Sequence, residues 1–405
     1  MFTVAPVTLA DVRAARDLLA DVVRRTPLEP NRALGERVGG DVFLKCENLQ
    51  RAGSFKIRGA YTRMARLTPD ERAAGVVAAS AGNHAQGVAL AARMLGIRAR
   101  IFMPAGAPLP KVQATRGYGA DVEFHGQTVD DALVAARTAA GEGSVLIHPF
   151  DHPDIVAGQG TVGLEVLEQC PDVATILVST GGGGLLAGIA TAVRALRPHT
   201  RIIGVQAEGA AAYPASLAAG HPVALTSMST MADGIAVGLP GEVPFSVISR
   251  QVDDVVTVSE EMISRALLFL LERAKLVVEP AGAAGVAALL DDDVVRLLRP
   301  PVVAVLSGGN VDPLLMLRVI RYGMSAAGRY LQFRVRLLDR PGSLAELLAL
   351  LAQVQANVLE VEHVRTSPRL SVGEVEIGLR LEMQGPAHCQ EVLAALRAAG
   401  HPLLF

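Results

Sequence analysis

One pattern repeats along the chain as far as residue 306: a short apolar run, a turn that contains glycine, and a stretch with helical spacing. Val76–Ala79 leads through such a turn to a helix that reaches Leu95, and Thr175–Ser179 leads through glycines to a helix that reaches Leu196. Other short apolar runs are Asp41–Lys45, Ala99–Met103, Ile202–Gln206 and Val302–Leu306. Apolar strands that alternate with helices are typical of parallel sheets covered on both faces, so the pattern predicts an α/β fold.

The pattern changes after Tyr330. Residues 332–337 alternate polar and apolar side chains, which is typical of a strand with one solvated face. The segments that follow are a turn at 339–343, a helix at 344–354, strands at 357–363 and 373–383, and a helix at 386–399. This β-α-β-β-α order predicts a separate, small α+β domain. We therefore expect one domain over residues 1–325 and a second over residues 331–405.

Composition excludes several classes of function. The net charge of −2 gives no electrostatic reason to expect binding to nucleic acid or to an anionic membrane. Tryptophan is absent, which disfavours base-stacking platforms, and no apolar run reaches membrane-spanning length. The cysteines, Cys46, Cys170 and Cys389, have no metal-binding or redox spacing, and the N-terminus lacks a signal-peptide pattern. These features indicate a cytoplasmic protein.

Lysine is scarce in this chain, which contains only Lys45, Lys56, Lys111 and Lys275. Lys56 stands in the run Gly53–Ala60, beside a phenylalanine and between two glycines. Arginine cannot form a Schiff base because its guanidinium stays protonated, whereas a neutral lysine amine can, and lysine binds pyridoxal phosphate in this way. A surface lysine that precedes a helix fits this run equally well when the run is considered alone.

Four consecutive glycines, Gly181–Gly184, stand between a predicted strand and a predicted helix. Glycine lets the backbone approach an anion closely, and the helix start adds N–H donors and a positive dipole end. The run is not a Walker loop, because no Gly-Lys-Ser/Thr follows, and it lacks the acidic residue of a dinucleotide fingerprint. The alternative is a tight turn required by helix packing. The run favours a phosphate site because packing alone does not need four glycines.

Three further turns carry polar residues. Ser80–His84 opens a predicted helix and suits a carboxylate or phenolate oxygen, although a histidine here is more often a packing residue. Ser307 follows an apolar strand, and its hydroxyl could hydrogen-bond a ring nitrogen or simply belong to a tight turn. Asp339–Ser343 could hold a small amino acid at a helix start or be plain turn chemistry. Glu208 and Asp233 are candidate cation ligands, although isolated acids are usually solvated.

Five motifs in this order resemble those of the fold type II pyridoxal-phosphate family, most closely its threonine ammonia-lyases (threonine dehydratases). They are Ser54–Arg58, Ser80–Gln86, Gly181–Leu185, Met231–Ile235 and Ser307–Asn310. The resemblance implies two parallel-sheet α/β subdomains, the smaller formed by about residues 50–150 and inserted in the larger. It implies pyridoxal 5'-phosphate as the cofactor, joined to Lys56 as a Schiff base. The implied cofactor-binding residues are Phe55, Lys56, Asn83, Gly181, Gly182, Gly183, Gly184, Leu185, Gly234, Glu279 and Ser307.

The resemblance also implies a reaction: dehydration and deamination of L-threonine to 2-oxobutanoate and ammonia, with L-serine as a second substrate that gives pyruvate. Lys56 would remove the α-proton. The substrate would lie against Ser80, Ala81, Gly82, Asn83 and His84. A serine racemase or serine dehydratase is the enzyme alternative, and an amino-acid sensor on an inactive scaffold is the alternative from another class.

Two differences from the racemases bear on the racemase alternative. Racemases of this fold carry a serine where this chain has Ala81, and alanine cannot transfer a proton. Glu208 and Ala212 match the racemase metal pattern, but Pro214 stands where an aspartate would be needed. We therefore expect elimination, with a monovalent or divalent cation at Glu208 and Ala212 as an open candidate.

Residues 331–405 resemble an ACT domain, the α+β regulatory module of amino-acid enzymes. Asp339, Pro341 and Gly342 match its ligand loop. The resemblance implies an amino-acid effector, with isoleucine, valine or the substrate as candidates, and an allosteric role in amino-acid metabolism such as isoleucine biosynthesis. Because these modules pair across subunits, it also implies a homodimer or homotetramer.

Overall fold

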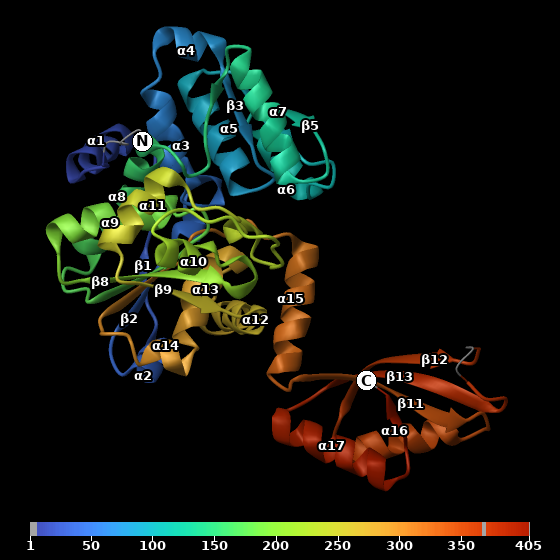
Figure 1. Cartoon of the computed structure of the whole chain (residues 1–405). Helices are drawn as coiled ribbons and strands as arrows, with labels where there is room; N and C mark the ends of the chain where they lie inside the picture. Colours follow the sequence, from blue (N-terminus) through green and yellow to red (C-terminus); the bar gives the residue numbers. More distant parts are fainter. Residues whose placement is uncertain (1–5, 367–369, 405) are drawn as a thin grey trace. The chain divides into compact units, whose positions relative to one another are not determined.

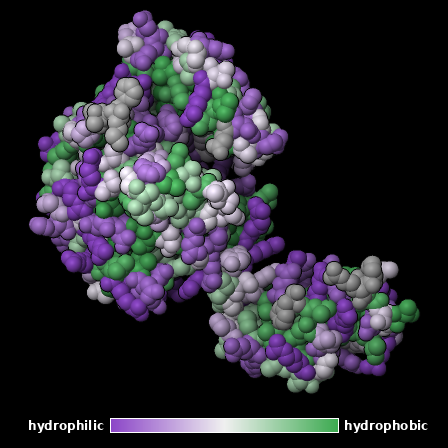
Figure 2. Space-filling model, in the orientation of Figure 1, coloured by the Kyte–Doolittle hydropathy of each residue, from purple (hydrophilic) through white to green (hydrophobic). Residues whose placement is uncertain are grey.

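The computed structural model describes residues 6–366 and 370–404 and divides into two compact units, Met1–Leu315 and Met316–Phe405 (Figure 1). The division falls inside helix α15 (Pro313–Ala326), which is earlier than the expected end of the first domain at residue 325. Hydrophilic and hydrophobic residues are interspersed over the visible face of each unit (Figure 2). Among the described residues, no helix is both long and apolar enough to cross a membrane.

The larger sheet of the first unit has the strand order β1-β2-β10-β7-β8-β9. Its strands are β1 (Leu28–Pro30), β2 (Val42–Lys45), β7 (Thr175–Ser179), β8 (Arg201–Ala207), β9 (Asp254–Val258) and β10 (Val302–Val305). All neighbours in this sheet pair in parallel except β1 and β2. The residues of β7 and β10 are buried throughout, as expected of strands covered on both faces.

The smaller sheet of the same unit is fully parallel and has the order β5-β4-β3-β6. Its strands are β3 (Val76–Ala79), β4 (Ala99–Met103), β5 (Asp121–Phe124) and β6 (Val145–Leu146). The first unit therefore has two parallel-sheet halves, each with its own cluster of buried apolar side chains. This arrangement confirms the predicted α/β class.

The α-helices of the first unit are α1 (Leu9–Leu19), α2 (Arg32–Val38), α3 (Lys56–Ala65), α4 (Pro69–Ala74), α5 (Asn83–Leu95), α6 (Leu109–Gly117), α7 (Val129–Gly141), α8 (Pro153–Gln169), α9 (Gly184–Leu196), α10 (Ala212–Ala219), α11 (Glu242–Gln251), α12 (Glu260–Phe269), α13 (Pro280–Leu289) and α14 (Asp292–Val295). Short turns of other helix types are η1 (Glu47–Leu49), η2 (Arg51–Gly53), η3 (Glu208–Ala210), η4 (Asp233–Ile235) and η5 (Leu270–Ala274).

Helices α3 and α8 touch through glycines. A Cβ atom on Gly158 would lie 2.6 Å from the carbonyl oxygen of Arg58, and one on Gly59 would lie 2.5 Å from Nε2 of Gln159. Only glycine allows this close approach. The contact fixes the place of α3, whose first residue is Lys56.

The second unit contains a four-stranded antiparallel sheet in the order β12-β13-β11-β14. Its elements are β11 (Tyr330–Leu338), α16 (Ser343–Gln353), β12 (Asn357–Val364), β13 (Glu374–Glu382), α17 (Pro386–Ala398) and β14 (Leu403–Leu404). The predicted β-α-β-β-α order is present, and the short edge strand β14 follows it. Apolar side chains of α16 and α17 join those of β11 and β13 in one buried cluster.

Candidate functional site

Lys56 is the first residue of α3. Its backbone packs against Gly87 of α5 in the smaller half, and the preceding residue, Phe55, is hydrogen-bonded to Ser307 of the larger half. The ammonium group of Lys56 donates a hydrogen bond to the carbonyl oxygen of Pro149 at 3.0 Å and lies 5.2 Å from the centre of the Phe55 ring. Burial disfavours the charged amine and lowers the Lys56 pKa to about 8, an effect that the nearby Glu279 partly offsets. The neutral amine that a Schiff base requires is therefore accessible near physiological pH.

The turn after β10 is attached to the segment that carries Lys56. The backbone N–H of Phe55 donates to the carbonyl oxygen of Ser307 at 3.2 Å, and Ser54 forms an isolated β-bridge with Gly308. The N–H of Gly309 donates to the carbonyl of Gly53 at 2.9 Å. The structure thus brings together two of the predicted motifs, although about 250 residues separate them in the sequence.

Asn83, at the start of α5, is held by two side chains from the other half of the unit. Its Nδ2 donates to Oε1 of Glu279 at 2.5 Å, and its Oδ1 accepts from Nδ2 of Asn310 at 2.8 Å. Asn310 also donates to the carbonyl of Ala52 at 2.7 Å. The amide plane of Asn83 is therefore fixed before any ligand binds. The roles predicted for Asn83 and Glu279 toward a cofactor stay predictions, but the two side chains are in direct contact.

Glu279 is buried and occupies the N-cap position of helix α13, where its side chain forms no capping hydrogen bond. Burial raises its pKa to about 7, and the negative charge of Asp233 contributes to the same shift. A Cβ atom on Gly308 would lie 2.3 Å from Oε1 of Glu279, so this carboxyl occupies space that only a glycine leaves free. Gly234 also approaches Glu279, with a Cβ position 3.5 Å from Oε1.

The glycine turn joins β7 to α9, and Gly183 is the N-cap with a φ of 95°, in the left-handed region. Its Cβ would lie 2.0 Å from the hydroxyl of Tyr213, and a Cβ on Gly182 would lie 2.4 Å from the Phe150 ring. Packing therefore requires glycine here, as the alternative reading of the run supposed. Helix α9 also leaves the first N–H groups at Gly184 and the residues after it without partners inside the helix.

The Ser80–His84 segment follows β3. The N–H of Gly82 donates to the Ser80 hydroxyl at 3.1 Å, and Ala81 places no polar side chain in the loop. His84 is buried, and its Nε2 pairs with the carbonyl of Ile147 at 2.7 Å. Burial lowers its pKa to about 3, so the ring is neutral at physiological pH. This geometry agrees with the packing role that is usual for such a histidine.

Four residues near these motifs were given no role by the sequence. Lys111 forms an ion pair of 2.6 Å with Asp233, and Lys111 also lies close to Gly82. Phe150 packs against the glycine turn, Tyr213 donates to the carbonyl of Gly182 at 3.2 Å, and Asn310 holds Asn83. The scarcity of lysine could have drawn attention to Lys111. The positions of Phe150 and Tyr213 carry no local signal.

The candidate cation ligands do not form a cluster. Within residues 6–366 and 370–404, no group of three or more His, Cys, Asp or Glu side chains could hold a metal ion. Glu208 lies exposed in η3, and the carbonyl of Ala212 accepts from the Ser216 hydroxyl at 2.7 Å. A cation at Glu208 and Ala212 therefore stays a prediction.

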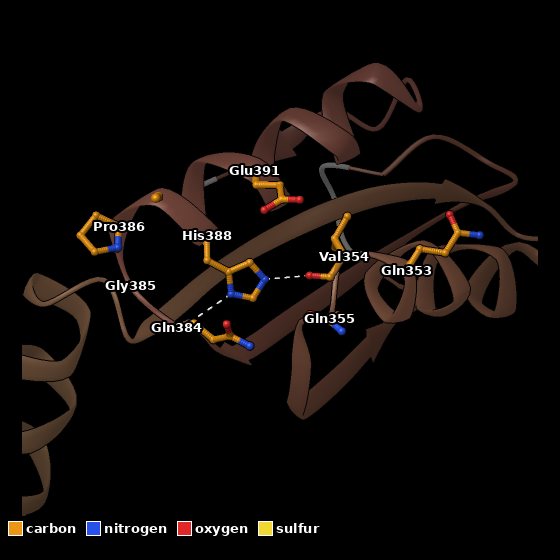
Figure 3. A pocket seen from close by; sticks show the side chains of 9 residues that line it. Gln353, Val354, Gln355, Gln384, Gly385, Pro386, His388 and Glu391 are labelled. Atoms are coloured by element: carbon orange, nitrogen blue, oxygen red, sulfur yellow. Dashed lines mark hydrogen bonds between the residues drawn. The ribbon is translucent and has the colours of Figure 1, made fainter.

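The second unit has its own candidate positions. Asp339 lies 3.3 Å from Arg365 in an ion pair, and Gly342, with a φ of 97°, is the N-cap of α16. A pocket of about 500 Å³ lies at the other end of α16 (Figure 3). It is lined by Gln353, Val354, Gln355, Gln384, Gly385, Pro386, Ala387, His388 and Glu391. The predicted effector residues Asp339, Pro341 and Gly342 are not part of this pocket.

The residues present fit the implied cofactor. Lys56 offers an amine with a lowered pKa, and the glycine turn and α9 offer N–H groups for a phosphate. The side-chain amide of Asn83 is already oriented by Glu279 and Asn310. The buried hydroxyls of Ser54 and Ser179, which adjoin these motifs, have no hydrogen-bond partner among the described residues. Such groups are what a bound ligand or an ordered water satisfies.

Comparison with known proteins agrees with this geometry. The family described as pyridoxal-phosphate dependent enzymes matches residues 19–308. The chain is 46% identical to the L-threonine ammonia-lyase of Thermotoga maritima over 98% of each chain, and 48% identical to that of Geobacter sulfurreducens, again over 98% of each. Among solved structures, maize serine racemase superposes with a TM-score of 0.74 at 36% identity, over 79% of this chain and 98% of that one. The chain belongs to the family of pyridoxal-phosphate dependent enzymes.

Proposed function

We propose that this protein is a threonine ammonia-lyase, which converts L-threonine to 2-oxobutanoate and ammonia. The observation that carries the proposal is its identity of 46% and 48% to two L-threonine ammonia-lyases over nearly the whole of each chain. Such coverage includes both units of the structure. It agrees with a site in which a lysine amine, an oriented asparagine and a glycine turn meet.

Pyridoxal phosphate, when bound, supplies an electron sink that acidifies the α-proton of an amino acid. Lys56 would hold it covalently, and the N–H groups of Gly181–Leu185 would hold its phosphate. Asn83 and Ser307 would face the ring, at its hydroxyl and its nitrogen. Ser307 is uncharged, so it would leave the ring nitrogen neutral, which favours elimination over transamination. Phe55, Gly234 and Glu279 complete the proposed pocket.

Lys56 is also the proposed base for the α-proton. A group with a pKa of about 8 is neutral in about a tenth of the molecules at pH 7, and the desolvated amine needs no further activation to take up a proton. The substrate carboxylate would lie against Ser80, Ala81, Gly82 and Asn83, where the start of α5 provides N–H donors. His84 would hold this loop in position, because its Nε2 is hydrogen-bonded to the carbonyl oxygen of Ile147.

L-Serine would be a second substrate that yields pyruvate. It lacks only the methyl group of threonine, and one methyl contributes only about 1–3 kcal/mol of discrimination. The structural likeness to maize serine racemase makes racemisation the second candidate reaction. Ala81 disfavours it, because racemisation needs a proton donor on the opposite face and an alanine side chain has none.

The first test is the visible spectrum of the purified protein before and after L-threonine, with 2-oxobutanoate release measured in the same cuvette. We expect a cofactor band that shifts as the oxo acid appears. A band that shifts without oxo acid would indicate racemisation. No band after reconstitution with pyridoxal phosphate would leave only the amino-acid sensor.

Replacement of Lys56 tests its two proposed roles. Lys56→Ala should abolish both turnover and the absorbance of covalently held cofactor, because an alanine side chain carries no amine to form the Schiff base or to take up the proton. The control is Lys275→Ala, since Lys275 is exposed and its ammonium donates to the carbonyl of Glu272 at 2.7 Å. Full activity of Lys56→Ala would exclude Lys56 as the base.

We further propose that the second unit binds an amino-acid effector through Asp339, Pro341 and Gly342, and that the protein is a cytoplasmic homodimer or homotetramer. The turn before α16, with the left-handed Gly342, supports the ligand loop. Isoleucine, valine and threonine are the probes. A shift of the threonine saturation curve or of the melting temperature by one of them would support regulation. If none shifts either quantity, the unit is structural.

A further inference from the structure

Lys111 and Asp233 form an ion pair between the two halves of the first unit. Lys111 lies on α6, which follows β4 of the smaller sheet, whereas Asp233 lies in η4, between strands of the larger sheet. Lys111 Nζ and Asp233 Oδ2 are 2.6 Å apart. The two side chains differ in exposure: that of Lys111 is 10% exposed and that of Asp233 is 54% exposed.

The ammonium group of Lys111 also lies beside the loop at the start of α5. It is 3.8 Å from the position that a Cβ atom of Gly82 would occupy, with no side chain between them. The helix start and the lysine charge therefore favour an anion at the same place. In this structure the carboxylate of Asp233 is the anion that pairs with the ammonium group of Lys111.

We propose that Lys111 is the counter-ion of the substrate carboxylate, and that Asp233 neutralises Lys111 only until the substrate binds. The inference rests on the proposed function, because it identifies the carboxylate as that of an amino acid held at Ser80–Asn83. It assigns Lys111 a role in substrate specificity.

The difference in exposure indicates which residue changes partner: Lys111 stays in place, and Asp233 is displaced by the substrate carboxylate. A buried cation without an anion is strongly unfavourable, so Lys111 needs a carboxylate partner in both states. Asp233 is half exposed and returns to water at small cost, because exposed ion pairs contribute only about 0.2–1 kcal/mol. An amine without a carboxylate cannot replace Asp233, so the exchange selects for amines that also carry a carboxylate.

The two residues should respond to substitution in opposite directions. Lys111→Met keeps the length of the side chain and removes its charge. It should raise the KM for L-threonine by about tenfold or more, since a hydrogen bond to a charged group contributes about 1.5–3 kcal/mol. Asp233→Asn removes the competing carboxylate and leaves Lys111 without an anion in the free protein, so it should lower the KM by at least about two- to fivefold. A pair that only holds the two halves together would raise the KM in both variants.

A binding measurement separates this role from effects on turnover. The cofactor band is titrated with L-threonine and with 1-amino-2-propanol, which is threonine without its carboxylate. Lys111→Met should weaken threonine binding and leave 1-amino-2-propanol unchanged. Lys275→Met is the control for loss of one positive charge, and it should alter neither affinity. Equal weakening for both ligands, or a raised KM in Asp233→Asn, would overturn the proposal.

The outcomes also separate this inference from the proposed function. If the unmodified protein releases no 2-oxo acid from threonine, the proposed function fails. If it does, but Lys111→Met keeps the KM and the threonine affinity of the unmodified protein, the role of Lys111 alone fails. Retention of the cofactor band in Lys111→Met shows that the variant is folded.

Discussion

Replacement of Arg58 should destabilise the first unit strongly, because Arg58 is the centre of a buried ionic network. Its Nε and Nη2 donate to the two carboxylate oxygens of Glu47 at 2.8 Å each, and its Nη1 donates to Glu165 at 2.6 Å. The side chains of Arg58 and Glu47 have no exposed surface. Burial disfavours the charged guanidinium, but the two carboxylates outweigh this effect and raise the Arg58 pKa further.

The magnitude follows from what each carboxylate would keep in Arg58→Met. Glu165 would keep the ammonium of Lys45 at 2.5 Å, whereas Glu47 would keep only the hydroxyl of Thr26 at 2.6 Å. Leaving one buried charge uncompensated costs about 3–5 kcal/mol. With about 2.1 cal/mol/K of unfolding entropy per residue over the 315 residues of the unit, Tm should fall by roughly 5–8 °C.

The assay is thermal and urea unfolding of the full-length protein and of three variants: Arg58→Met, Glu47→Gln and the double substitution. The double variant should be more stable than the sum of the single effects predicts, by about 1–3 kcal/mol, because neither charge is left alone. Arg296→Met is the matched control, since the Arg296–Asp293 pair is 2.8 Å long but exposed and should contribute less than about 1 kcal/mol. An Arg58→Met protein within about 1 kcal/mol of the original, or additive single effects, would refute the reasoning.

Two further predictions concern the cofactor site. Burial lowers the Lys56 pKa to about 8. The rate at which cofactor-free protein takes up pyridoxal phosphate, followed by absorbance, should therefore rise about tenfold per pH unit up to pH 8 and then level off. A rate that keeps rising to pH 10 would show that Lys56 has the pKa of an ordinary lysine. Gly183→Ala should lose its cofactor during gel filtration, because the new Cβ would lie 2.0 Å from the Tyr213 hydroxyl. The control is Gly220→Ala, which also has a positive φ but no atom within 4 Å of its Cβ position, and it should keep the cofactor. Equal retention in the two variants would show that the glycine turn tolerates a side chain.

Local patterns predicted the elements of the fold well. The bounds of Val76–Ala79, Ala99–Met103 and Thr175–Ser179 agree with the strands, because apolar runs between glycine-bearing turns are encoded in adjacent residues. The strands Leu28–Pro30, Asp121–Phe124, Val145–Leu146, Asp254–Val258 and Leu403–Leu404 were not predicted. Each lies at an edge of its sheet, and its pairing depends on a partner outside the adjacent residues.

The site divides in the same way. Lys56 could be selected as a candidate because lysine is scarce in the chain. The glycine turn and Ser307 could be selected because each follows a strand, where residue types report on local backbone needs. Lys111 could not be paired with Asp233, because their contact depends on how the two sheets come together. For the same reason, no pattern indicated that Phe150 would fill the space beside the glycines.

The contacts around Lys56 explain how one lysine can be both fixed and available. Its backbone begins α3, which is held two residues later by the buried guanidinium of Arg58 and at its start by the bridge between Ser54 and Gly308. Its amine, in contrast, has one neutral acceptor, the carbonyl of Pro149. A carboxylate partner at that distance would raise the pKa and keep the amine charged. Strong ionic contacts thus hold the helix, and the amine of Lys56 has a weaker, neutral contact. In the proposed function, α3 can therefore stay in place while this amine changes partners.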